Sequence, residues 1–358
     1  MRARSGQSWE PLAFLLVALA LLAVAGCSSA GNTDEDENTA SPGVCDDVQR
    51  VLSVGFYPFF APVSYSASDD PKSEGFHQHL GYEADLLTAL EAIEDDGLSL
   101  ARQAIPIWEG IWLESAGPEY DLVGGGITIL DSRTLDSAGN PAIRFTNGHI
   151  TFRQSLLVRT EDAELLAGYD QLTSSVRVGV LPGTTGEARL LELTGLVDNN
   201  GTLVAGTSAV TPQGTVVADG SSDFFITAAS NSENLRSRER LIPAAETMPQ
   251  VVYLGEQAGE VDLLDALADG SIDAVARGEI GNLNATHASG GTFTVSALDD
   301  QVEYGGFSFD LADEELASCL NEAIDFLTDG QGIGYSQWLE NPSVFMERAL
   351  SRNSLGSG

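Results

Sequence analysis

The feature that most constrains the fold is a strand–helix–strand order that occurs twice along the chain. In the first half, the β-prone run "VLSVGFYPFF" (51–60) precedes a helical apolar stripe in "GYEADLLTALEAIED" (81–95) and a strand-like "LSLARQAI" (98–105). A short helix over 107–115 and an apolar strand, "YDLVGGGITI" (120–129), follow. Strands and helices in this alternation build a parallel sheet covered by helices. The pattern therefore predicts an α/β unit.

The second half of the chain repeats this order of strands and helices. The stretch "SVRVGVLPGTTGEARLLEL" (175–193) predicts a strand, a glycine turn and a helix, and 249–278 predicts strand, helix and strand. The last stretch, 304–341, predicts a strand and two amphipathic helices. Between these lies 196–248, rich in Gly, Thr, Ser and Asn, which we interpret as a hairpin-like insertion into the second unit. Two α/β units in tandem are therefore expected.

The N-terminal residues have the pattern of an export signal. A charged start and an apolar run within 1–26 are typical of a secretory signal, and "VAGC" resembles the bacterial lipobox, which predicts lipidation of Cys27. Two or more acyl chains make a stable membrane anchor. The acidic stretch 27–44 lacks apolar periodicity, so we expect a flexible tether. An ordinary secretory signal with an incidental cysteine is the alternative.

The charge of the chain excludes some partners. The 53 Asp and Glu residues against 17 Lys and Arg give a net charge of −36, and Lys72 is the single lysine. Such a chain does not bind nucleic acid or anionic lipid through non-specific attraction. Excess carboxylate with almost no lysine is typical of proteins from high-salt organisms, so the composition is halophilic in character.

The remaining cysteines and the histidines are the candidates for a disulfide bridge or a metal site. Cys45 and Cys319 form an even pair in an exported chain, which favours a disulfide that ties both ends of the fold; two separate buried thiols are the alternative. The two histidines of "HQH" (77–79) lack a third ligand, so we expect no metal and no cofactor.

Six motifs in order give the chain a family resemblance. From about residue 48 to about 342, interrupted by 196–248, it resembles the family 3 solute-binding proteins, the extracytoplasmic receptors of polar amino-acid ABC importers. The motifs are "YPFF", "GYEADLLTALE", "IWEGIW", "YDLVGGGITILDSR", "VRVGVLPGTTGE" and "GSIDAV", closed by "YGGFSF…LNEAIDFLTDGQG…W". Each motif is weak alone, and their shared order carries the resemblance.

The resemblance implies an α/β fold of two lobes, the type II periplasmic-binding-protein clamshell, in which two crossover strands join the lobes. Hinge closure of such lobes buries a ligand at their interface. The expected boundaries are lobe one at 45–147 and 304–345, lobe two at 148–303 with the insertion at about 196–248, crossovers near 147–151 and 299–304, and a tail at 346–358.

The resemblance also assigns a grip for the ligand's carboxylate. Arg133 stands where the family's arginine holds that group, and its planar guanidinium can donate two parallel hydrogen bonds to a carboxylate. A solvated surface arginine is the alternative. Gly126 and Thr128 match ligand-contacting positions, although Leu130 replaces a second hydroxyl often found in the family. Glycines that only let the strand turn or pack closely are the alternative there.

Further contacts are implied from both lobes. Thr184 and Thr185 open a predicted helix after a glycine turn, and a helix N-terminus attracts anions; a simple N-cap is the alternative. Phe56, Tyr57 and Trp108 match the aromatic wall around the ligand side chain, unless they are core aromatics.

The main departure from the family concerns the ligand's amino group. The family's aspartate for an α-ammonium is replaced here by Gly278, with Glu279 beside it. Either Glu279 takes the role of that acid after a shift of one residue, or the ligand has no α-amino group. The sequence leaves this choice open, together with the ligand's identity and the role of the insertion.

These observations predict a non-enzymatic, monomeric lipoprotein, anchored outside the cytoplasmic membrane, that delivers a small carboxylate ligand, such as a polar amino acid, to an ABC permease. One alternative is an enzyme similar to cyclohexadienyl dehydratases, which share the fold and carry a glutamate where Glu187 stands in "PGTTGE". Another is a sensory protein that presents its ligand to a membrane receptor.

Overall fold

The computed structural model describes residues 50–93, 98–255 and 258–355. The predicted signal segment, the lipidation site Cys27, the acidic tether and Cys45 lie outside these described residues. Cys319 is disulfide-bonded, and its partner is not among the described residues. The pairing with Cys45 therefore stays a prediction.

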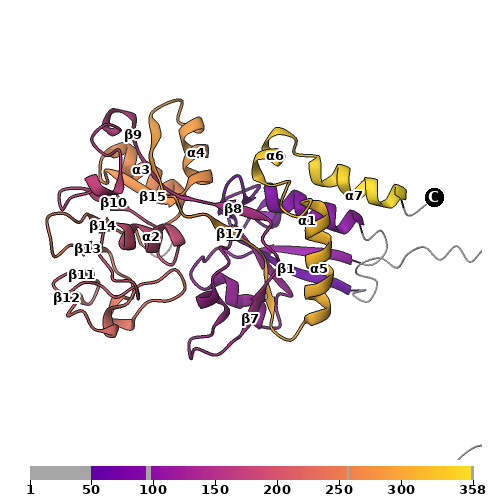
Figure 1. Cartoon of the computed structure of the whole chain (residues 1–358), viewed down its shortest axis with the longest axis horizontal. Coiled ribbons are helices and arrows are strands. Elements are labelled where there is room, and N and C mark those ends of the chain that lie inside the picture. Colours follow the sequence, from indigo (N-terminus) through magenta and orange to yellow (C-terminus); the bar gives the residue numbers. More distant parts are fainter. Residues whose placement is uncertain (1–49, 94–97, 256–257, 356–358) are drawn as a thin grey trace, which may run out of the picture. The chain divides into compact units, whose positions relative to one another are not determined.

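The first lobe, as we use the term below, is built on a five-stranded sheet (Figure 1). Strand β1 pairs in parallel with β5 and β6, whereas β18, from late in the chain, pairs antiparallel with β6 and β7. In sheet order the strands are β5 (Leu98–Ala104), β1 (Arg50–Phe56), β6 (Leu122–Gly124), β18 (Ser308–Asp310) and β7 (Ile143–Phe145).

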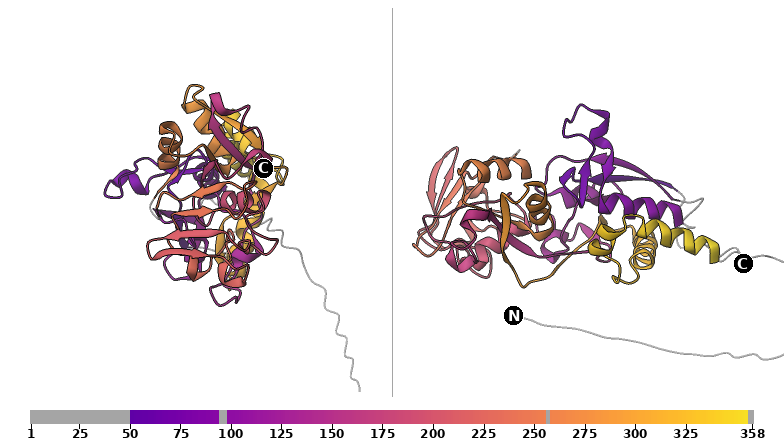
Figure 2. Two further views of the ribbon diagram at one scale, coloured as in Figure 1. Left: turned by 90° about the vertical axis from the view of Figure 1, so that its left-hand side faces the viewer. Right: turned by 90° about the horizontal axis from the view of Figure 1, so that it is seen from above.

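Four α-helices of the described residues belong to this lobe, and three of them, α1, α5 and α7, pack together (Figures 1 and 2). They are α1 (Tyr82–Ile93), α5 (Glu314–Leu327), α6 (Tyr335–Glu340) and α7 (Val344–Leu355). The predicted tail from residue 346 is instead most of helix α7, because its side chains Phe345 and Ala349 are fully buried in the core of this lobe.

The second lobe is built on an eight-stranded mixed sheet. Strand β10 pairs in parallel with β14 and β15, and the other pairings are antiparallel. The order is β12 (Gly214–Val217), β11 (Ser208–Thr211), β13 (Arg240–Ile242), β14 (Gln250–Val252), β10 (Arg177–Gly179), β15 (Ala274–Gly278), β9 (Gln154–Arg159) and β16 (Phe293–Leu298). Its helices are α2 (Thr185–Leu193), α3 (Glu260–Asp269) and α4 (Glu279–Ala288).

Two short strands connect the lobes. β8 (Ile150–Phe152) and β17 (Glu303–Gly305) pair antiparallel and lie between the two main sheets (Figure 1). A small three-stranded sheet of β2 (Phe59–Phe60), β3 (Ser64–Ser66) and β4 (His79–Leu80) follows β1. The 3₁₀ helices are η1 (Glu74–His77), η2 (Ile111–Ala116), η3 (Asp131–Thr134), η4 (Thr160–Asp162), η5 (Tyr169–Gln171), η6 (Ser222–Phe224) and η7 (Glu233–Leu235).

The insertion at 196–248 continues the second sheet. Its strands β11 and β12 form a hairpin, and β13 pairs with both β11 and β14. Buried leucines anchor the insertion in the core of the second lobe, among them Leu203, Leu235 and Leu241. The insertion is therefore an integral part of that lobe.

Candidate functional site

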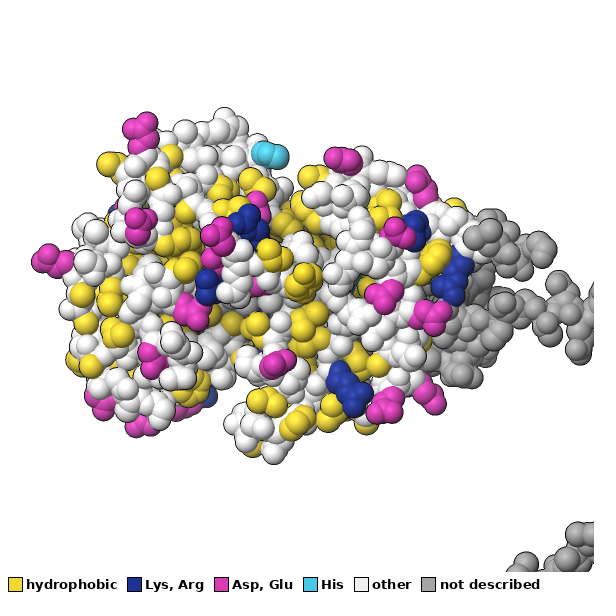
Figure 3. Space-filling view, viewed as in Figure 1, with side chains coloured by type: hydrophobic (Ala, Val, Ile, Leu, Met, Phe, Trp, Pro, Cys, Tyr) yellow, Lys and Arg dark blue, Asp and Glu magenta, His cyan; other side chains and the backbone are white. Residues whose placement is uncertain are grey.

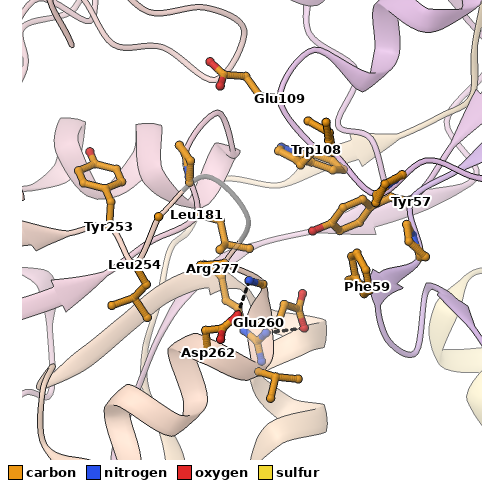
Figure 4. Close-up of a pocket in the computed structure, with 18 of the residues that line it drawn as sticks. Tyr57, Phe59, Trp108, Glu109, Leu181, Tyr253, Leu254, Glu260, Asp262 and Arg277 are labelled. Carbon is orange, nitrogen blue, oxygen red and sulfur yellow. Dashed lines mark hydrogen bonds and ion pairs between the residues drawn. The ribbon is translucent and has the colours of Figure 1, made fainter. Parts of the chain in front are cut away.

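A large cavity is lined by residues of both lobes. It measures about 1420 Å³, and a smaller one of about 70 Å³ shares five of its lining residues. In Figure 4, Tyr57, Phe59 and Trp108 lie on one side and Leu181, Tyr253 and Leu254 on the other. Apolar side chains gather on the viewed face where the lobes meet, and acidic ones are spread around it (Figure 3).

Tyr57 and Trp108 form the aromatic wall on the side of the first lobe. Tyr57 follows β1 directly, and its N–H donates to the Gly124 carbonyl at 3.2 Å. The Trp108 ring meets it edge-on, with centroids 5.1 Å apart, and the Trp108 indole N–H donates across the cleft to the Gly183 carbonyl at 3.1 Å. Both residues line both cavities.

Phe56, which was predicted for the same wall, lies elsewhere. It is fully buried, stacked on His79 with centroids 4.0 Å apart, and lines neither cavity. Phe59 and Phe60 take its place, one on each cavity. Pro58 lies between β1 and β2, the strand that contains Phe59 and Phe60. The in-and-out alternation of side chains along β1 therefore does not extend to these two rings, and the sequence pattern did not indicate them as part of the wall.

The glycines after β6 hold the backbone close to this wall. A Cβ at Gly126, whose φ is +74°, would lie 2.5 Å from the Phe60 ring. The amides of Gly125 and Gly126 donate to the buried Glu83 carboxylate at 2.7 and 2.9 Å. Burial raises the pKa of Glu83 to about 7, against these two hydrogen bonds. Gly126 lines the small cavity, although its N–H is already used by Glu83.

Arg133 is fully buried, and its hydrogen bonds go to backbone carbonyls. Nε and Nη2 donate to the Ala228 carbonyl at 3.1 and 2.9 Å, Nη1 to that of Thr128 at 3.1 Å, and Nη2 also to that of Gly183 at 3.1 Å. The guanidinium lies 4.2 Å from the centroid of the Trp112 ring. Burial lowers the pKa of Arg133 to about 9, and the charge of Glu303 opposes this shift.

No carboxylate within the described ranges makes an ion pair with Arg133, whose hydrogen-bond acceptors are neutral. A buried charge without a counter-ion is costly to the fold. The charge of Glu303 acts on the guanidinium without an ion pair, so a directly bonded anion would stabilise Arg133 further. Arg133 itself is covered and lines neither cavity.

The start of α2 faces Arg133 and Trp108 from the second lobe. Thr184 is the N-cap, and its hydroxyl accepts from the Glu187 N–H at 3.1 Å. The Thr185 hydroxyl lies 3.4 Å from that of Thr128, across the cleft, and accepts from the Gln154 amide at 2.9 Å. Gln154 also donates to Glu303 at 2.8 Å. Thr128, Thr184, Thr185 and Gln154 all line the small cavity.

Glu187 is buried in a closed network of its own. One oxygen accepts from the Gly183 N–H at 2.7 Å. The other accepts from the Tyr253 hydroxyl at 2.6 Å and makes an ion pair with Arg238. Arg238 also lies over the Tyr253 ring, 4.6 Å from its centroid. Glu187 lines neither cavity, so its carboxylate serves the fold of the second lobe.

Gly278, which stands where the family has an aspartate, has free space around it. A Cβ added at Gly278 would meet no atom within 4 Å, and Gly278 lines the small cavity. Glu279 begins α4 and lines neither cavity. Glu260 does line both, and it is paired with Arg277 at 2.5 Å. Burial, followed by the charge of Glu260, raises the pKa of Tyr57, so this carboxylate acts on the aromatic wall.

No group of three or more His, Cys, Asp or Glu among the described residues has the geometry to hold a metal ion. No helix in the described ranges is long and apolar enough to span a membrane.

Comparison with known proteins identifies the fold. No family model matches the chain, and no curated protein matches it. An ancestral arginine-binding protein bound to arginine matches with a TM-score of 0.54 and 15% identity, over 82% of this chain and 98% of that one. The Streptococcus pneumoniae amino-acid ABC transporter substrate-binding protein AbpA, bound to L-arginine, matches with a TM-score of 0.52 and 15% identity, over 83% and 95%.

A third match is the ancestral amino acid-binding protein AncCDT-1, described as a precursor of cyclohexadienyl dehydratase. It has a TM-score of 0.53 and 18% identity, over 81% of this chain and 94% of that one. The chain therefore has the two-lobed fold of the type II periplasmic binding proteins, which confirms the fold predicted from the motifs.

Proposed function

We propose that this chain, with its type II periplasmic-binding-protein fold, is an extracytoplasmic solute-binding lipoprotein that closes its lobes on a small carboxylate ligand of the amino-acid type. Lipidation at Cys27 would tether it outside the cytoplasmic membrane, and an ABC permease would receive the ligand. Two of the matched structures are named as amino-acid-binding proteins, one as an arginine-binding protein and one as the substrate-binding protein of an amino-acid ABC transporter.

The observation that carries the proposal is that Arg133 makes no direct ion pair with a carboxylate of the described residues. Its guanidinium is fully buried among neutral carbonyls and beside an indole ring. A ligand carboxylate would supply the missing negative charge and make stronger hydrogen bonds than a neutral oxygen can. Thr128 and Thr185, whose hydroxyls meet across the cleft, would bind polar groups of the same ligand.

The aromatic wall supports a ligand with an apolar or cationic side chain. Tyr57 and Trp108 present ring surface to the large cavity, and aromatic faces attract both apolar groups and cations. The dehydratase alternative gains no support, because both oxygens of Glu187 are engaged inside the second lobe. A sensory role would use the same cleft, and only the identity of the membrane partner separates it from import.

A thermal-shift screen of the purified protein in high salt tests the proposal. The panel contains the amino acids and matched carboxylates that lack the α-amino group. A ligand at a hundred times its Kd adds about 2.7 kcal/mol to the free energy of unfolding. Stabilisation by carboxylates that disappears in Arg133→Ala would support the proposal, and no stabilisation by any member of the panel would contradict it.

A further inference from the structure

A tight turn within the insertion reaches the first lobe. Ile226 and Asn231 form an isolated bridge, and the four residues between them, Thr227–Ser230, are called the insertion tip below. The Thr227 N–H donates to the Ser230 carbonyl at 2.9 Å, and the Thr227 hydroxyl accepts from the N–H groups of Ala229 and Ser230 at 3.3 and 3.1 Å. The tip is therefore an ordered turn.

Three contacts fix the tip against the first lobe. The Ala228 carbonyl accepts two hydrogen bonds from Arg133, and Ala229 packs against the apolar cluster around Trp112. Just beyond the tip, the Asn231 amide donates to the Glu109 carboxylate at 2.7 Å. The insertion thus bridges the cleft, although its strands belong to the second lobe.

The Ala228 carbonyl uses one whole edge of the guanidinium. Nε and Nη2 both donate to this single oxygen, at 3.1 and 2.9 Å. A carboxylate bound side-on would use the same two N–H groups, one for each of its oxygens. The carbonyl is neutral and offers one acceptor atom, so it is the weaker partner of the two. A ligand carboxylate and the insertion tip therefore compete for the same donors.

From this geometry we infer that the insertion tip is a specificity-determining part of the ligand site, acting as an internal competitor for Arg133. The inference rests on the function proposed above. A carboxylate reaches the Nε–Nη2 edge only by displacing the Ala228 carbonyl, which lowers its affinity. A ligand group that binds elsewhere in the cleft, such as a neutral amide, is not subject to this competition.

The test replaces the insertion tip with a two-residue Asn-Gly turn. Because Ile226 and Asn231 are already bridged, a type I′ turn can connect them without the Ala228 carbonyl. Acetate and acetamide serve as the simplest carboxylate and its neutral counterpart, beside the amino acids of the panel. Binding is followed by tryptophan fluorescence, since Trp112 and Trp108 lie 4.2 and 5.6 Å from the Arg133 guanidinium carbon.

The shortened protein is expected to bind acetate and the amino acids at least tenfold more tightly than the wild type, with the affinity for acetamide unchanged. A second variant, Thr227→Val, only loosens the turn by removing its hydroxyl, and should shift affinity in the same direction by a smaller factor. Thr215→Val, an exposed position of β12 in the same insertion, is the matched control and should change nothing.

The outcomes separate the two proposals. Equal carboxylate affinity in wild type, shortened protein and Thr227→Val would overturn the competitor role and leave the proposed function intact. Weaker carboxylate binding after shortening would show that the tip is a supporting wall, which also overturns it. If neither protein bound any carboxylate, the proposed function itself would fail and the inference with it. Circular dichroism and urea unfolding verify that each variant is folded.

Discussion

Two buried arginines in this molecule both lie over an aromatic ring, but only one of them has a carboxylate partner. Arg133 in the first lobe and Arg238 in the second are both nearly inaccessible to solvent, and each lies over an aromatic ring, at 4.2 Å from Trp112 and 4.6 Å from Tyr253. Arg238 has a buried carboxylate partner, Glu187, whereas Arg133 has carbonyl oxygens.

The difference appears in the pKa of each group. Burial acts to lower the pKa of Arg238, but the charge of Glu187 and its hydrogen bond to Arg238 outweigh it, so the pKa is raised. For Arg133 burial prevails and the pKa falls to about 9, with Glu303 opposing it through space. The fold supplies the counter-ion of Arg238 itself. Under the proposed function a ligand carboxylate would take that role for Arg133, so we expect Arg238 to matter most for stability and Arg133 for binding.

The largest effect is expected from Arg238→Met, which leaves Glu187 buried without its cation. Breaking a buried pair in this way costs about 3–5 kcal/mol. Urea unfolding should show this loss, whereas the exposed neighbour Arg240→Met should stay close to wild type. Arg238 lines the large cavity, but its guanidinium is already paired with Glu187, so the protein that remains folded should keep its affinity for carboxylates. A loss below about 1 kcal/mol would mean that the pair contributes little.

Arg133→Met should give the reverse pattern. Two charge-assisted hydrogen bonds contribute about 1.5 kcal/mol each, so carboxylate affinity should fall on the order of 100-fold. Stability should fall by about 1–3 kcal/mol, because buried carbonyls lose their donor while an uncompensated charge is also removed. Calorimetric titration and urea unfolding of the same samples test both parts. Unchanged affinity together with a loss as large as that of Arg238→Met would erase the contrast.

A third buried ionisable group, His149, extends the comparison to a side chain that can be neutral at ordinary pH. Burial lowers its pKa to about 3 from the ordinary 6.5. Unfolding therefore takes up a proton below pH 6.5, and stability present above that pH is lost as pH falls toward 3.

The slope from this group is about 1.4 kcal/mol per pH unit. His149→Phe, which keeps a ring stacked between Tyr82 and Phe307, should reduce the acid sensitivity by this amount. Urea unfolding at several pH values between about 4 and 6 gives the slope of the free energy of unfolding against pH in both proteins. Parallel slopes would mean that His149 binds a proton as readily in the folded protein as in the unfolded chain.

The smallest effect is expected from Gly278→Asp. The position is open, since an added Cβ meets no atom within 4 Å, and it faces the small cavity. A carboxylate here should raise the preference for α-amino acids over their des-amino counterparts about tenfold, the value of one charge-assisted hydrogen bond. A Gly278→Asn variant separates charge from shape. If both changes left the preference as it was, the ligand's amino group would lie elsewhere.

Local features of the fold could be predicted from the sequence because their signals are local. The apolar stripe predicted within 81–95 contains α1, the β-prone run at 51–60 contains most of β1 and all of β2, and the glycine turn at 182–184 precedes α2 as predicted. The helix α7 was missed, because it buries only a narrow stripe, including Phe345 and Ala349, against the rest of the lobe.

Most of the site depends on pairs that are distant in the sequence. Gln154 and Glu303 are 149 residues apart, and Arg133 and Ala228 are 95 apart. No periodicity links such positions. The acceptor on the insertion tip is a backbone carbonyl, which every residue has, so no side-chain pattern could have indicated it. The predicted ligand contacts at Arg133, Thr128 and Thr185 do lie near one another, and their binding role stays a prediction.

The most direct test of the central claim is a calorimetric titration of one carboxylate ligand from the panel and of its primary amide, in wild type and in Arg133→Met. If Arg133 binds the carboxylate, wild type should prefer the acid over the amide on the order of 100-fold, and the variant should bind both equally weakly. Equal affinity for acid and amide in wild type would contradict the claim and make Arg133 a structural contact between the lobes.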